Sequence, residues 1–111
     1  MTVSENFIEY VLDQLSNWDG ISKRKMFGGL ALYRYGQIFS FVADDIVYLK
    51  VNEITKEKFL DAGSKPFKPF PNRPIIESYY ELPANIIEDP DKFIEWAEES
   101  LSIKKNEYNS F

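Results

Sequence analysis

Chemistry in this sequence depends on carboxylates, lysines and tyrosines, because the chain contains neither histidine nor cysteine. Without histidine there is no Ser–His–Asp triad, no imidazole general base and no imidazole zinc ligand. Without cysteine there are no disulfides, no thiol nucleophile and no thiolate metal site. Any catalysis would have to use Asp, Glu, Lys, Tyr, Ser or Thr.

Two groups of carboxylates have a spacing that invites a chemical interpretation. Glu77, Tyr79 and Glu81 alternate along an expected strand, so their side chains would converge on one face. Asp44 and Asp45 are adjacent between two apolar runs, where such pairs are usually hairpin-turn residues. No third carboxylate stands at a recognisable metal-ligand spacing. We therefore expect no catalytic residues, no cofactor and no metal site, and we expect that the protein is not an enzyme.

Basic residues gather in two short stretches, although the formal net charge of the chain is −5. One is a triplet before a Gly-Gly pair, and the other lies in a proline-rich segment with interleaved phenylalanines. Such segments can bind single-stranded nucleic acid, but they can equally be solvated edges and core anchors. An acidic domain is a poor default binder of phosphates. The candidate contact residues are Lys23, Arg24, Lys25, Lys65, Lys68, Arg73 and Tyr79.

Helical periodicity predicts three helices. The first runs from about Ser4 to Ser16 and carries an apolar stripe. A short second helix covers residues 52–62, with Ile54, Phe59 and Ala62 on its apolar side and Gly63 closing it. The last begins at Asp89-Pro90, a pairing typical of an N-cap followed by the first helical position.

The strands are expected in two groups within an antiparallel sheet. A meander from Lys23 to Val51 contains three apolar runs, at residues 30–33, 38–42 and 46–51. An irregular edge segment follows at residues 67–71 and a regular strand at residues 75–82. The middle run is apolar on both faces. Helices would therefore cover one face of the sheet, and a partner chain would cover part of the other, which predicts a homodimer.

The expected fold class is α+β, a two-layer α/β sandwich with a five-stranded antiparallel sheet. Residues 1–111 would form a single domain with a frayed tail at 106–111. The sequence has no apolar run of about 18 residues and no signal peptide, so we expect a cytoplasmic protein with no membrane partner.

Several motifs, in order, resemble the N-terminal domain of the TfoX/Sxy family of bacterial regulators linked to DNA competence. The most specific are Arg24-Lys25-Met26-Phe27-Gly28-Gly29 and Ser78-Tyr79-Tyr80-Glu81-Leu82-Pro83. Residues 7–15, 43–51 and 59–67 and a closing helix with Trp96-Ala97 complete the resemblance.

The resemblance implies the order helix, three strands, helix, two strands, helix, similar to secretion chaperones. Larger members add a domain resembling helix-hairpin-helix modules, which is lacking in a chain ending at Phe111. The family offers no catalytic residues to transfer. The resemblance implies a regulatory module that binds an unknown protein, with the transcription machinery as one candidate. The alternative is direct nucleic-acid binding through the local basic patches.

Overall fold

The computed structural model describes residues 3–26, 28–68, 72 and 74–103. The helices are α1 (Glu5–Gln14), α2 (Lys56–Asp61), α3 (Ala84–Ile87) and α4 (Pro90–Leu101). The strands are β1 (Ile21–Met26), β2 (Gly29–Arg34), β3 (Gln37–Ala43), β4 (Ile46–Lys50), β5 (Pro66–Phe67) and β6 (Ile76–Glu81). No helix in the described ranges is long and apolar enough to cross a membrane. The expected tail at 106–111 lies outside these ranges.

Within the described residues, the sheet has six antiparallel strands in the order β1-β2-β3-β4-β6-β5, so the expectation of five strands was wrong. The strand that the sequence did not reveal is β1, which pairs along its whole length with β2. Four of its six residues are exposed and its ends are only partly buried, so no apolar alternation marks it as a strand. Its strand conformation depends on β2, which returns directly after the turn at Gly28.

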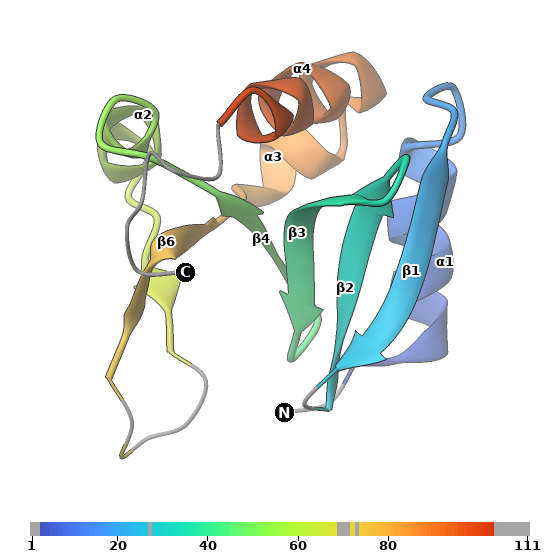
Figure 1. Ribbon diagram of the computed structural model, residues 1–111, viewed down its shortest axis with the longest axis horizontal. Coiled ribbons are helices and arrows are strands. Elements are labelled where there is room, and N and C mark those ends of the chain that lie inside the picture. The colour runs from blue at the N-terminus through green and yellow to red at the C-terminus, as the bar shows by residue number, and fades with distance from the viewer. Residues whose placement is uncertain (1–2, 27, 69–71, 73, 104–111) are drawn as a thin grey trace.

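One face of the sheet packs against the helices and forms the main hydrophobic core. All four helices contribute side chains to this core, including Val11 from α1, Phe59 from α2, Ile86 from α3 and Phe93 from α4. Figure 1 shows α1 lying behind β1 and β2. The helical layer therefore reaches the outer strand β1.

The opposite face carries a second apolar cluster, to which the described helices contribute nothing. Its buried members are Ala31, Phe41, Ala43, Tyr48 and Phe67. The Phe67 ring centroid lies 5.3 Å from that of Phe41 and 4.7 Å from that of Tyr48. Side chains of the strands thus bury much of this face within one chain. The expected homodimer stays a prediction.

Two tight turns set the register of the meander. Tyr35 and Gly36 have φ angles of 49° and 81°, and Asp44 and Asp45 have angles of 53° and 57°. Two consecutive positive φ values at two-residue loops are the geometry of type I′ hairpins. The interpretation of the Asp pair as turn residues is confirmed. Asp45 also accepts hydrogen bonds from the Ser4 amide at 2.8 Å and the Ser4 hydroxyl at 3.2 Å, which fastens α1 to this hairpin.

The N-cap of α4 and the glycine after α2 were predicted correctly, but the residues that α2 buries were not. Ser4 caps α1 and Asp89 caps α4 through their side chains. Gly63 has a φ of 78° and follows α2, as expected. Ile54, however, is 83% exposed, and Ala62 is exposed too, because α2 begins only at Lys56 and turns Phe59 alone into the core. The short helix α3 was not predicted, since four residues are too few to show a period.

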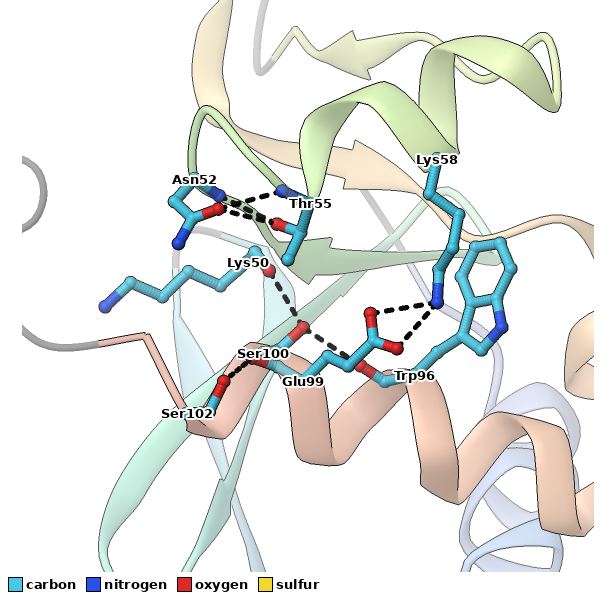
Figure 2. A network of polar contacts seen from close by, with 8 residues as sticks. All are labelled: Lys50, Asn52, Thr55, Lys58, Trp96, Glu99, Ser100 and Ser102. Carbon is cyan, nitrogen blue, oxygen red and sulfur yellow. Dashed lines mark hydrogen bonds and ion pairs between the residues drawn. The ribbon is translucent and has the colours of Figure 1, made fainter.

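A polar network fastens α2 to α4 on the helical side of the sheet (Figure 2). The Lys58 ammonium donates to both carboxylate oxygens of Glu99, at 2.8 and 2.9 Å, and lies 4.0 Å from the centre of the Trp96 ring. The buried Ser100 hydroxyl donates to the Lys50 carbonyl at 2.8 Å, which joins α4 to the end of β4. These contacts fix the positions of α2 and α4 relative to the sheet.

We expect Glu99→Gln to lower the free energy of unfolding by at most about 1 kcal/mol, because both partners of this ion pair are partly exposed. The loss should shrink in high salt, which screens the pair. Urea titrations at low and high salt measure it. The control is Glu53→Gln, since Glu53 is 80% exposed and pairs with Lys56 at 3.5 Å, and no measurable change is expected there. A salt-independent loss at Glu99 would contradict the electrostatic explanation.

Candidate functional site

The candidate basic residues lie at opposite edges of the sheet. Lys23, Arg24 and Lys25 belong to β1, while Lys65 and Lys68 flank β5. Four strands separate β1 from β5 in the sheet order. The two groups therefore do not form one continuous basic strip. Arg73, the remaining basic candidate, lies outside the described residues.

Tyr79 lies on β6 and packs, half-buried, beside the second apolar cluster. Burial, and to a smaller extent the nearby Tyr33, raise the pKa of Tyr79 to about 12. Burial also raises the pKa of Tyr48 to about 12, with smaller contributions from Glu81 and Asp44. These phenols are part of the packing of the sheet.

We expect the stability of the protein to fall as the pH rises from about 10 to about 12, because the unfolded tyrosines ionise first. A folded-state pKa above the unfolded value means that the stabilisation is complete below pH 10 and is lost above it. Tyr79→Phe should flatten this alkaline decline, and Tyr48→Phe should do the same independently. Urea titrations at about pH 8 and about pH 11 measure the decline. If both variants decline as the wild type does, the burial explanation is wrong.

The carboxylates offer no metal site within the described ranges, where no three Asp or Glu side chains cluster closely enough to hold an ion. Asp45 is engaged with Ser4 at the start of α1. The Asp44-Asp45 pair thus forms a turn, and Asp45 joins that turn to α1.

The basic triplet divides between the two faces of the sheet, as strand geometry requires. Lys23 and Lys25 lie opposite Leu32 and Leu30, on the face that packs against the helices. Arg24 lies opposite Ala31, on the second face. All three side chains are exposed, and none of them has an ion pair with a described residue.

A cleft of about 860 Å³ runs between α1 and β1. Its α1 side carries Glu5 and Glu9, and its strand side carries Lys23 and Lys25. The remaining lining is mostly apolar and consists of Val3, Ile8, Leu12, Met26, Gly28, Gly29 and Leu30. A cleft with an apolar floor and a few charged groups at its rim is a typical binding site for part of another molecule.

The outer edge of β1 presents free backbone groups. The Tyr35 amide donates to the Gly20 carbonyl at 2.8 Å, which places a hydrogen-bonded pair one step before β1. Hydrogen-bonded and non-hydrogen-bonded pairs alternate along an antiparallel ladder. The amides and carbonyls of Ser22, Arg24 and Met26 therefore point toward β2. Those of Ile21, Lys23 and Lys25 point outward, and no described residue pairs with them.

A cluster at the start of β1 fixes this edge in place. The Arg34 guanidinium lies 4.5 Å from the Trp18 ring centre and 5.1 Å from that of Tyr35, and it pairs with Asp19 at 3.2 Å. The Tyr35 hydroxyl donates to the same carboxylate, which lowers the pKa of Asp19 and raises that of Tyr35. The loop from α1 into β1 is thus held against the β2–β3 hairpin.

Sequence reasoning found the basic triplet but missed the cleft and the open edge. The sequence did hold one signal for β1, because the triplet runs into a glycine pair that separates it from an apolar strand by a turn. The cleft had no such signal, because it depends on how far α1 reaches across the sheet.

The chain was compared with curated proteins and with models of protein families. Among curated proteins, no match to the chain is found. The family model described as the TfoX N-terminal domain matches residues 13–103, which is most of the 111-residue chain. The matched region includes β1 and every later element of the fold. The chain therefore belongs to the TfoX N-terminal domain family.

Proposed function

We propose that this domain is a non-enzymatic regulatory module that acts by binding another protein at β1. Membership of its family suggests a regulatory, competence-related role, and the family is of a non-catalytic type. The observation that carries the proposal is an exposed basic triplet on an outer strand, beside a cleft of about 860 Å³, whose three side chains have no ion pair with a described residue.

A protein partner fits this surface better than a nucleic acid does. Phosphate binding needs a continuous basic surface, whereas the basic groups of β1 and β5 lie at opposite edges of the sheet. The formal net charge of −5 also disfavours the binding of a nucleic acid.

The test is affinity capture from lysate of the native cells, with and without nuclease. The bait is the wild-type domain or the triple variant Lys23→Ala/Arg24→Ala/Lys25→Ala. The charge-matched control is Lys65→Ala/Lys68→Ala/Lys92→Ala, which removes three exposed cations away from β1. We expect a protein that survives nuclease, is lost with the β1 variant and is kept with the control.

Two outcomes would overturn the proposal. Loss of every captured species on nuclease treatment would indicate that the domain binds nucleic acid. Equal capture by the β1 variant and by the control would place any protein-binding surface elsewhere on the molecule.

A further inference from the structure

We infer that β1 binds an extended acidic segment of its partner, which adds to the sheet as a further antiparallel or parallel strand. This inference rests on the proposed function and specifies the chemistry of the partner. Strand addition to an open edge is a recurring mode of peptide recognition, in which backbone hydrogen bonds supply affinity and side-chain contacts supply specificity.

The two edges of the sheet differ in their ability to accept a strand. β5 has only two residues, begins with Pro66 and is irregularly paired with β6. Proline and short, irregular strands close an edge to further pairing. β1 has six residues in unbroken register with β2. Its outward amides and carbonyls at Ile21, Lys23 and Lys25 are spaced two residues apart, as a partner strand requires.

The exposed charges on β1 itself are all positive, whereas the carboxylates of Glu5 and Glu9 lie across the cleft on α1. An acidic residue paired with β1 would therefore neighbour Lys23, Arg24 or Lys25. On the helix face, residues of the partner would lie opposite Lys23 and Lys25, at the mouth of the cleft. On the second face, a residue of the partner would lie beside Arg24. Opposite charges on neighbouring strands stabilise their pairing. The apolar part of the cleft lining on the helix face, which includes Ile8 and Leu30, can accept an aliphatic side chain from the same segment.

The same charges exclude a second copy of this chain as the occupant. Pairing β1 with another β1 would place Lys23, Arg24 and Lys25 against their counterparts. Like charges on facing strands destabilise pairing, and basic residues on edge strands are a common protection against self-association. β1 is therefore protected against pairing with another β1, but it can pair with an acidic strand.

The experiment uses a fluorescent peptide of alternating glutamate and valine as the probe. The matched peptide of alternating lysine and valine is the charge control. We expect the acidic peptide to bind in fluorescence anisotropy titrations at low salt, and to bind at least about tenfold more weakly to the triple alanine variant of β1. The Lys65→Ala/Lys68→Ala/Lys92→Ala control should bind as the wild type does. Equal binding of both peptides would overturn the charge selection.

A proline–alanine pair at one position separates strand addition from simple charge attraction. Lys23→Pro and Lys23→Ala remove the same charge, but only proline also removes an outward amide, and that amide makes no bond to β2. We expect Lys23→Pro to bind the acidic peptide at least about tenfold more weakly than Lys23→Ala. Equal affinities would overturn strand addition.

Amide hydrogen exchange of the wild type provides a readout that needs no variant to fold. The outward amides of Lys23 and Lys25 should gain protection when the acidic peptide binds, whereas those of Ser22 and Arg24 are already protected by β2. Peptide binding without added protection at Lys23 and Lys25 would overturn the inference. A protein whose capture is lost with the triple alanine variant, but is equal for Lys23→Pro and Lys23→Ala, would support the proposed function and contradict only strand addition.

Discussion

Replacing Phe39 with alanine is expected to lower the free energy of unfolding by about 3–5 kcal/mol, because the change leaves a cavity at the centre of the main core. Phe39 is 0% exposed, and its ring packs edge-on against Trp18 at a centroid distance of 5.3 Å. A domain of this size has a total stability of roughly 5–15 kcal/mol, so the variant should be close to unfolding. Urea titration followed by tryptophan fluorescence measures the change.

Ile54→Ala is the matched control for this prediction. The Ile54 side chain is 83% exposed, so its truncation should change the stability by no more than about 0.5 kcal/mol. This contrast separates burial from hydrophobicity, because both residues are large and apolar. A cost at Phe39 below about 1 kcal/mol, or a larger cost at Ile54, would contradict the assignment of the core.

Gly29→Ala is expected to destabilise the protein by about 1–3 kcal/mol through steric overlap. A Cβ atom at Gly29 would lie 2.6 Å from the Val42 carbonyl oxygen and 2.7 Å from the Phe41 ring. The carbonyl belongs to β3 and the ring to the second apolar cluster, so neither moves freely. Thermal unfolding together with near-ultraviolet circular dichroism measures both the loss and the displacement of the ring.

Gly36 provides the comparison, because its requirement for glycine has a different cause. Gly36 has a φ of 81°, and a Cβ atom at this position would meet no described heavy atom within 4 Å. Asparagine tolerates this conformation, so Gly36→Asn should cost little. Gly29→Asn should cost more than Gly29→Ala, because overlap grows with size. If asparagine were equally tolerated at both positions, the steric explanation at Gly29 would be wrong.

The sequence predicted those parts of the fold that local chemistry determines. The capping side chain of Asp89, the turn at Asp44-Asp45 and the glycine after α2 each act within a few residues. β1 could not be predicted in this way, because its exposed polar residues become a strand only by pairing with β2. The exposure of Ile54 follows from where α2 begins, at Lys56, because the Asn52 side-chain oxygen accepts hydrogen bonds from the amides of Ile54 and Thr55 and holds them in a turn before the helix.

The candidate site was predictable in its charges and not in its geometry. The basic triplet is visible in the sequence, but its division between two faces depends on the strand assignment that was missed. The separation of Lys65 and Lys68 from β1 depends on the order of strands in the sheet. The acidic rim formed by Glu5 and Glu9 depends on the placement of α1 over β1. Each of these relations joins residues that are far apart in the sequence.

Regulation through β1 is tested by comparing the transcript profiles of the native cells. One strain lacks the protein, one carries the triple alanine variant of Lys23, Arg24 and Lys25, and one carries the Lys65→Ala/Lys68→Ala/Lys92→Ala control. A regulatory module that binds its partner at β1 predicts that the β1 variant reproduces the changes seen in the deletion strain, while the control resembles the wild type. A β1 variant that behaves as the wild type, at equal protein level, would contradict the account.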